Sequence, residues 1–292
     1  MNFSELTPFR QIKKLYIALL DSSLALKSIS LSLKSLPFSA DDYLADLSSK
    51  SACSINSEAN VGVYAINDTL LLLDKTSLVD RMVIETGGWE NAQVDYLKKI
   101  SENFRGKDPI FLDLGSYWGH YSFNMLKLGI FKKIYAYDAD AYNYSQFCAN
   151  VFLNACEDVV IANHSAVSDV AGMLVMQKSK SIEDGNRGAT RILSSNEVQS
   201  GLYNSREVPA VAIDDELDIQ DSYLVIKMDV EGHEDKALLG MQKLIQNNKV
   251  IIQVEIYKEQ TSRVLPVIKK LGLRKINEIY PDFYFTNIEL LS

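Results

Sequence analysis

Short apolar runs alternate with amphipathic stretches along the second half of the chain, in the order expected of strands and helices. Five runs end in a polar or ionisable residue, and they span residues 109–113, 133–137, 159–162, 223–228 and 250–254. Continuous apolar runs suit strands that are buried on both faces of a parallel sheet. Two further strands are expected at about residues 275–278 and 283–288. The pattern predicts an α/β fold with a doubly wound sheet.

The residues before this pattern are expected to form an extension. Residues 61–73 hold Asn67-Asp68 between two apolar runs, which predicts a hairpin. Residues 9–20 have the spacing of an amphipathic helix. We favour a helical cap on the core for this helix, with a docking or dimerisation arm and a membrane-surface helix as alternatives. The predicted domains are therefore an extension over residues 1–80 and an α/β domain over residues 81–292.

A glycine turn follows the first strand of the sheet, with Gly115 and Gly119 at its ends. A strand, a glycine turn and a helix make up the nucleotide-binding half of many α/β folds. The turn lacks the G-x-G-x-x-G pattern of pyrophosphate binding, because Tyr117 and Trp118 stand where small residues are needed. A ligand without phosphates fits better, and S-adenosylmethionine is one such ligand.

Polar side chains stand at the carboxyl ends of the predicted strands, where ligands bind in open α/β sheets. These residues are Asp113, Asp138, His164, Asp229 and Glu255. Asp138 follows the glycine turn by about 20 residues, which is the spacing of an acid that accepts hydrogen bonds from ribose hydroxyls. It indicates a nucleoside cofactor and does not distinguish NAD from S-adenosylmethionine.

Four segments resemble the FkbM family of S-adenosylmethionine-dependent methyltransferases: DLGSYWGHYS, YAYDADAYNYSQFCANVFLN, NHSAVSDVAG and IKMDVEGHEDKALLG. The resemblance covers roughly residues 80–260. It implies a class I methyltransferase fold, which is Rossmann-like, with a seven-stranded sheet in the order 3-2-1-4-5-7-6 and an antiparallel last strand. It also implies O-methylation of sugars, glycans or other secondary metabolites.

The resemblance also implies roles for particular residues. Asp113, Gly115 and Gly119 would hold the methionine end of the cofactor, Asp138 the ribose, and Asp229 would lie near the transferred methyl group. Tyr117 or Trp118 would stack on the adenosine. The complete set of expected cofactor-binding residues is Asp113, Gly115, Ser116, Tyr117, Trp118, Gly119, Asp138, Ala139, Ser165, Ala166 and Asp229.

The segment around the fourth strand carries the candidate catalytic residues, which are Lys227, Asp229, Glu231, His233 and Glu255. A carboxylate or a histidine can accept the proton of an acceptor hydroxyl. In an alternative, the three carboxylates hold a divalent cation that lowers the pKa of the hydroxyl. Because Lys227 brings a positive charge to the same place, we favour a metal-free base, either His233 or Asp229.

A polar insertion, residues 177–204, separates the third and fourth strands of the sheet. It carries Arg187 and Arg191 in an acidic chain, with glycines that permit loop motion. Guanidinium groups suit carboxylates or phosphates of an acceptor. The insertion is expected to form or border the acceptor pocket, with a solvated surface loop as the alternative.

Composition narrows the remaining choices. A net charge of −8 gives no general attraction to nucleic acid, so the expected partner is a small-molecule or glycan acceptor. Residues 15–26 are apolar but too short to span a bilayer. Cys53, Cys148 and Cys156 lack metal-ligand spacing and indicate a reducing cytoplasm. A homo-oligomer formed through the extension, a dehydrogenase and a non-catalytic cofactor-binding module stay open as alternatives.

Overall fold

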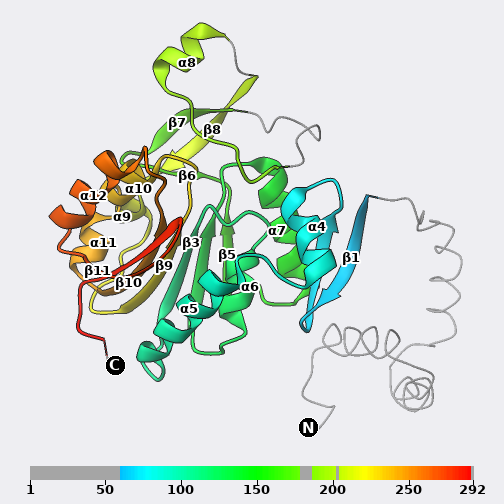
Figure 1. Ribbon diagram of the computed structural model, residues 1–292, viewed down its shortest axis with the longest axis horizontal. Helices are drawn as coiled ribbons and strands as arrows, with labels where there is room; N and C mark the ends of the chain where they lie inside the picture. The colour runs from blue at the N-terminus through cyan, green and yellow to red at the C-terminus, as the bar shows by residue number, and fades with distance from the viewer. Residues whose placement is uncertain (1–59, 178–185, 202–203, 291–292) are drawn as a thin grey trace, which may run out of the picture. The chain divides into compact units, whose positions relative to one another are not determined.

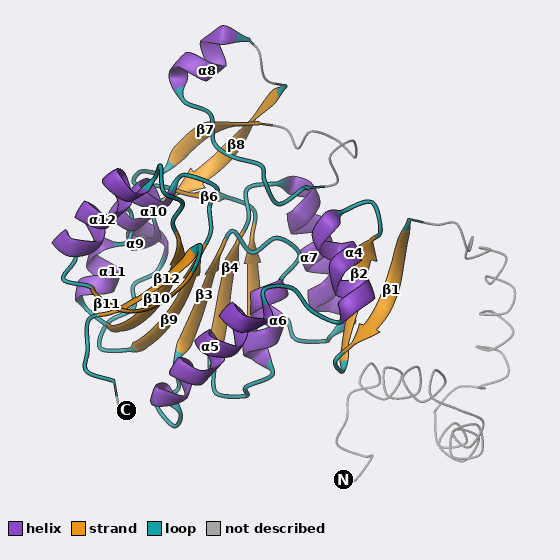
Figure 2. Cartoon of the chain, in the orientation of Figure 1, coloured by secondary structure: helices purple, strands orange, loops and turns teal. Residues whose placement is uncertain are grey.

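A computed structural model describes residues 60–177, 186–201 and 204–290 of the protein. The amphipathic helix predicted near the N-terminus lies outside these residues. One compact unit runs from Asn60 to Ser292. It is built on a central sheet with helices on both faces (Figures 1 and 2). The boundary expected between residues 80 and 81 stays a prediction.

The central sheet has the predicted strand order. Its strands are β3 (Ile110–Leu114), β4 (Lys133–Tyr137), β5 (Val160–Asn163), β9 (Tyr223–Met228), β10 (Lys249–Glu255), β11 (Arg274–Ile279) and β12 (Asp282–Thr286). They lie in the order β11-β12-β10-β9-β3-β4-β5. Strand β12 runs antiparallel to both of its neighbours. Counted along the chain, this order is 3-2-1-4-5-7-6, so the prediction is confirmed. The connections change direction between β3 and β9, where such sheets bind ligands.

Two layers of helices cover the sheet because successive side chains of each strand point to opposite faces. Phe111 and Val225 join one apolar cluster, and Leu112 and Ile226 join the other. The first face is covered by α5 (Asn91–Ser101), α6 (His120–Leu126) and α7 (Ala141–Leu153). The second is covered by α10 (Glu234–Leu239), α11 (Gln242–Gln246) and α12 (Thr261–Lys270).

The predicted hairpin is present before the sheet. Strands β1 (Val61–Ile66) and β2 (Thr69–Asp74) pair antiparallel. Asn67 and Asp68 both have a positive φ, as the commonest two-residue hairpin turn requires. Helix α4 (Leu78–Thr86) follows and ends at Gly87, whose left-handed conformation caps it.

Side-chain amides of α7 bind the second edge of β2. Asn150 accepts a hydrogen bond from the Leu72 amide at 2.6 Å, and Gln146 donates to the Leu72 carbonyl at 2.8 Å. One turn further along, Asn154 accepts from the Leu70 amide and donates to its carbonyl. The three amides stand four residues apart, so they form a row along one face of the helix. These hydrogen bonds connect the β1–β2 hairpin to α7, which packs on the central sheet.

A second, three-stranded sheet was not predicted. It contains β6 (Ala166–Val167), β7 (Gly172–Gln177) and β8 (Ser205–Val211), in the order β6-β8-β7. The expected insertion connects β7 to β8 and contains α8 (Ser195–Ser200), while its residues 178–185 and 202–203 lie outside the described part of the chain. The insertion is therefore the connection of a β-hairpin in which all residues of β7 pair with β8.

Several helical elements are short. Helices α10 and α11 are separated at Gly240, where a Cβ atom would lie 1.8 Å from the Ser168 carbonyl oxygen. Helix α5 continues directly into a short 3-10 helix, η2 (Glu102–Phe104). A short helix, α9 (Ile213–Glu216), was not predicted. In the part of the chain that the structure describes, no helix is long and apolar enough to cross a membrane.

Candidate active site

The main cavity lies at the carboxyl ends of the parallel strands, with a volume of about 220 Å³. Most of the residues that the sequence singled out form its wall. They are Gly115, Ser116, Tyr117, Asp138, Ala139, Ser165, Ala166, Lys227, Asp229, Glu231, His233 and Glu255. Residues from five strand ends therefore meet at one site, although they are spread over more than 140 positions of the chain.

Three expected cofactor contacts, Asp113, Trp118 and Gly119, are not part of this wall. Asp113 is buried beneath it, where its carboxylate accepts hydrogen bonds from the backbone amide and the hydroxyl of Ser122. Trp118 is 1% exposed and belongs to the apolar core. Between the two candidates for stacking on an adenosine, only Tyr117 faces the cavity.

The glycine turn needs its glycines because other backbone and ring atoms approach it closely. A Cβ atom on Gly115 would lie 1.7 Å from the Asp229 carbonyl oxygen, and one on Gly119 would lie 2.4 Å from the Phe147 ring. Both glycines have a positive φ, as does Tyr117 between them. Tyr117 packs against the same apolar cluster that encloses Trp118, with the two ring centres 6.2 Å apart, but only Tyr117 also reaches the cavity.

Asp138 fixes the turn from the neighbouring strand. Its carboxylate accepts hydrogen bonds from the backbone amides of Tyr117 and Asp140, both at 2.8 Å. Burial raises the pKa of Asp138 to about 7, although both hydrogen bonds oppose this change. The carboxylate lies in the cavity wall, where it is available to a ligand hydroxyl.

A buried ion pair forms the opposite wall. Lys227 Nζ lies 3.1 Å from Asp229 Oδ2 and 4.9 Å from the centre of the Tyr121 ring. Burial disfavours the ammonium, but attraction by Asp229 and Asp282 outweighs it and holds the pKa of Lys227 well above its ordinary value. Tyr121 in turn donates a hydrogen bond to Glu90 at 2.8 Å. The lysine therefore stays charged inside the protein.

Two further carboxyl groups share this wall with Asp229. Burial, with the charge of Asp229 as the second cause, raises the pKa of Glu255 to about 10 and that of Glu231 to about 8. Glu255 also accepts a hydrogen bond from the Tyr257 hydroxyl at 3.2 Å. Burial and the charge of Asp229 therefore favour the protonated form of both glutamates. Within the described ranges, no group of three or more Asp, Glu, His or Cys side chains is arranged to hold a metal ion.

The three histidines differ in position. His233 lines the cavity, its Nε2 lies 2.9 Å from Ser168 Oγ, and burial lowers its pKa. His120 also lines the cavity, and burial lowers its pKa to about 4. His164 is not in the wall, since its ring stacks on Tyr144. Two of the histidines therefore line the cavity, and His233 is the one closer in sequence to Asp229 and Glu231. Its lowered pKa favours the neutral imidazole.

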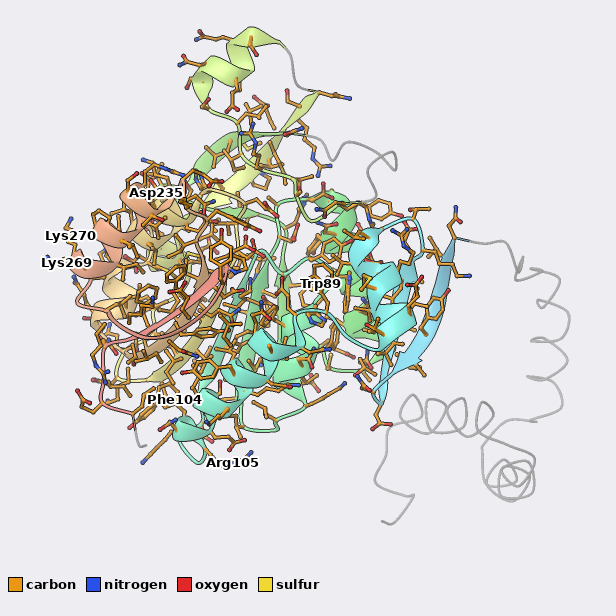
Figure 3. The ribbon with its side chains drawn as sticks, in the orientation of Figure 1. Trp89, Phe104, Arg105, Asp235, Lys269 and Lys270 are labelled. Carbon is orange, nitrogen blue, oxygen red and sulfur yellow. The ribbon has the colours of Figure 1, made fainter. Side chains whose placement is uncertain are left out.

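Several wall residues were missed from the sequence. Trp89 and Glu90 come from the segment between α4 and α5, and Figure 3 shows Trp89 beside these helices. Asn143, on the first turn of α7, is 2% exposed, and its Oδ1 has no hydrogen-bond partner among the described residues. Ser116 Oγ is likewise buried without a partner there. Asp140 caps the N-terminus of α7, and the signal available in the sequence for Asn143 was its place three residues after this acid.

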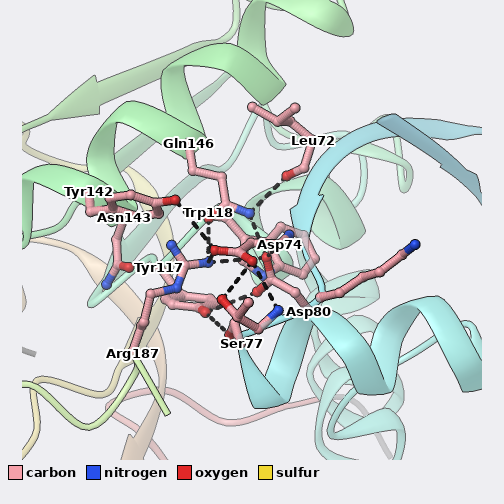
Figure 4. A network of polar contacts seen from close by, with 12 residues as sticks. Leu72, Asp74, Ser77, Asp80, Tyr117, Trp118, Tyr142, Asn143, Gln146 and Arg187 are labelled. Carbon is pink, nitrogen blue, oxygen red and sulfur yellow. Dashed lines mark hydrogen bonds and ion pairs between the residues drawn. The ribbon is translucent and has the colours of Figure 1, made fainter. Parts of the chain in front are cut away.

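The insertion borders the cavity through Asn186, Gly188 and Thr190. Its arginines, however, pair with acids of this chain. Arg187 Nη2 lies 3.2 Å from Asp80 Oδ2 and donates to Gln146 at 2.9 Å, in a network that Figure 4 shows.

Arg191 pairs with Glu197 at 2.5 Å. Each guanidinium group thus already pairs with a carboxylate of the protein, while Nε and Nη1 of Arg187 are buried without a partner among the described residues. The use of the two arginines to bind an anionic acceptor stays a prediction.

Comparison with known proteins gives a family and a group of structural likenesses. None of the curated proteins matches the chain. Among solved structures, methyltransferase FkbM from Methylobacillus flagellatus is 14% identical, with a TM-score of 0.43, over 71% of this chain and 52% of that one. The chain thus spans about half the length of that protein.

TYW2 from M. jannaschii, solved in complex with AdoMet, is 12% identical with a TM-score of 0.40, over 80% of this chain and 86% of that one. A precorrin 8W decarboxylase from Methanobacterium thermoautotrophicum is 13% identical with a TM-score of 0.41, over 75% of this chain and all of that one.

The family model described as the methyltransferase FkbM domain matches residues 113–275. This range begins at the last residues of β3 and ends on β11, so it contains the glycine turn, Asp138 and the buried ion pair. The seven-stranded sheet with its antiparallel strand β12 is the class I methyltransferase arrangement. Since the match covers more than half of the chain, the protein belongs to the FkbM methyltransferase family.

Proposed function

We propose that this protein transfers the methyl group of S-adenosylmethionine to a hydroxyl of a sugar, glycan or other secondary-metabolite acceptor. One observation carries most weight: the glycine turn, Asp138 and the Lys227–Asp229 pair line a single cavity at the point where the sheet connections change direction. The choice of a hydroxyl acceptor rests on the family resemblance. The cavity has residues that can bind the cofactor and residues that can accept a proton. Thiols at Cys148 and Cys156 support a cytoplasmic location.

The cavity wall fits a nucleoside cofactor. Asn143 Oδ1 and Ser116 Oγ are buried beside Asp138 without partners among the described residues, so each can bond a ligand hydroxyl or amino group. Asp138 would accept from the ribose, and Tyr117 would face the base. When bound, the sulfonium of S-adenosylmethionine supplies an activated methyl group.

The carboxyl groups near Asp229 suit that positive charge. A cation beside Glu231 and Glu255 favours their ionised forms and lowers their raised pKa values. The same wall carries one lysine, which is already paired, so it offers little attraction to an anionic acceptor. Cofactor binding is therefore expected to release protons.

His233 or Asp229 would take the proton of the acceptor hydroxyl as the new O–CH3 bond forms and the S–CH3 bond breaks. His233 is suited to this role because its lowered pKa keeps the imidazole neutral at physiological pH. Lys227 would hold Asp229 in place. We propose base catalysis without a metal, so activity should survive EDTA. Loss of activity with EDTA and its return with magnesium would overturn this mechanism.

The cofactor assignment can be tested by calorimetry and product detection. We expect S-adenosylmethionine to bind the wild-type protein and Asp138→Ala to lose about tenfold or more in affinity, because a charge-assisted hydrogen bond is removed. Asp158→Ala is a matched control, since Asp158 is outside the cavity wall. Binding of NADH with no response to S-adenosylmethionine would refute the assignment. Binding without S-adenosylhomocysteine formation across a panel of hydroxyl acceptors would indicate a non-catalytic module.

A further inference from the structure

A second cavity, of about 140 Å³, shares His120 with the main one. Its wall comes from the turn of the β1–β2 hairpin, the Gly87–Gly88 segment, one face of α5, and the residues from Trp118 to Lys127. The space holds several water molecules and is therefore large enough for a phosphate-sized group. Neither the family resemblance nor the proposed reaction uses this cavity.

Two lysines bring positive charge to the second cavity. Lys98 of α5 and Lys127, which follows α6, both line it. Burial, and next the positive charge of Lys98, lower the pKa of Lys127, so the two ammonium groups are close enough to repel each other. Asp95 is the one acid in the described wall, and Asp68 attracts Lys127 from outside it. A bound anion would relieve the repulsion between the lysines.

Several hydrogen-bond donors belong to the residues of this wall. The Trp118 side chain is 1% exposed, and its Nε1–H has no acceptor among the described residues. An indole N–H can only donate, and leaving it buried without an acceptor is unfavourable. The amides of Asn67 and Asn124 already donate to the carbonyls of Gly87 and His120. Lys98 uses one donor on Asn124, at 2.8 Å, and has two more.

We propose that the second cavity binds a small oxyanion of the phosphate or sulfate class. Its oxygens would accept hydrogen bonds from Trp118 Nε1 and from the ammonium groups of Lys98 and Lys127, because these groups still have N–H bonds to donate. The ligand would contact the residues that follow Tyr117 in the glycine turn, from the side opposite the cofactor.

The test uses the indole N–H signals of the full-length protein labelled with ¹⁵N. The chain has two tryptophans, Trp89 and Trp118, and Trp89→Phe assigns the pair. Inorganic phosphate or sulfate, added at constant ionic strength, should move the Trp118 signal downfield as its N–H gains an acceptor. The Trp89 signal should move little, because Trp89 lines the main cavity and not the second one.

Variants separate this site from weak binding elsewhere on the surface. Lys98→Gln with Lys127→Gln removes both charges and should weaken phosphate binding by about tenfold or more. Lys99→Gln is the matched control, since Lys99 is the next residue of α5 and is not in the wall; it should leave binding unchanged. An unmoved Trp118 signal, an equal shift with chloride alone, or equal binding by the double variant would each overturn the proposal.

Discussion

Two buried cations of this protein have similar surroundings and different consequences. Arg187 lies 3.2 Å from Asp80 and 4.4 Å from the centre of the Tyr142 ring. Lys227 lies 3.1 Å from Asp229 and 4.9 Å from the centre of the Tyr121 ring. Each is therefore a cation held between a carboxylate and a tyrosine, and each is more than nine-tenths buried.

The difference lies in what surrounds each pair. Asp80 is also bonded by the Asp74 amide, by Gln146 and by the Tyr117 hydroxyl, so its oxygens are occupied from several sides (Figure 4). Around Lys227 there are more carboxyl groups than the lysine can neutralise, and they face a cavity.

Hydrogen bonds to both oxygens of Asp80 hold that pair in the fold, although Nε and Nη1 of Arg187 are buried without a partner among the described residues. A surplus of carboxyl groups, by contrast, leaves some of them able to bind a ligand or a proton. We therefore expect the first pair to act on stability and the second on the proposed reaction.

The largest effect is expected at Asp229. Asp229→Asn should lower methyl transfer by about a thousandfold while cofactor binding is retained, because a group that positions or accepts the proton is lost. His233→Ala separates the two readings of the base, since it leaves the Lys227–Asp229 pair intact. Asp158→Asn is the control, as Asp158 is exposed and is not in the cavity wall. Turnover is measured as S-adenosylhomocysteine, with circular dichroism to check the fold. Activity near the wild-type level in both site variants would refute this role.

Removing the other cation should act on stability. Arg187→Met leaves Asp80 buried without its charged partner, which should lower the free energy of unfolding by about 3 kcal/mol in urea titrations. Arg105→Met removes an arginine from an exposed pair with Glu102 and should leave the free energy of unfolding nearly unchanged. Equal effects of the two variants would show that the Arg187 network does not stabilise the fold.

The smallest effect concerns pH. The pKa of Glu231 is raised to about 8 in the folded protein, above its ordinary value near 4.5, because of burial and the charge of Asp229. The folded state then holds a proton that the unfolded state releases, so stability falls as pH rises through this window. Glu231→Gln should reduce that fall by on the order of 2 kcal/mol between about pH 5 and pH 8. An identical pH profile for the variant would show that Glu231 ionises normally.

The sequence predicted the central sheet because its signals are local. An apolar run followed by a polar residue, such as residues 223–229, predicts a strand and the position of its carboxyl end from local sequence alone. The family resemblance then supplied the strand order. Residues at the carboxyl ends of the strands form most of the cavity wall. The pairing of β7 with β8 escaped prediction, since the segment between them is long and polar.

The errors in the site have a common cause. Arg187 and Asp80 are 107 positions apart, so nothing near the arginine reveals the carboxylate that pairs with it. Tyr117 and Trp118 are neighbours in sequence and their ring centres lie 6.2 Å apart, but only Tyr117 lines the cavity, while Trp118 is 1% exposed. Long-range partners and differences in burial of this kind become visible only in three dimensions.

The row of amides on α7 has a consequence for association between molecules. An open strand edge is a template for pairing with a strand of another chain, and proteins commonly protect such edges with charges or prolines. On the edge of β2, Gln146, Asn150 and Asn154 bond the backbone instead, donating and accepting as a strand would. Because the shielding groups carry no charge, the edge stays closed to strand addition at any pH and salt concentration in which the protein is folded.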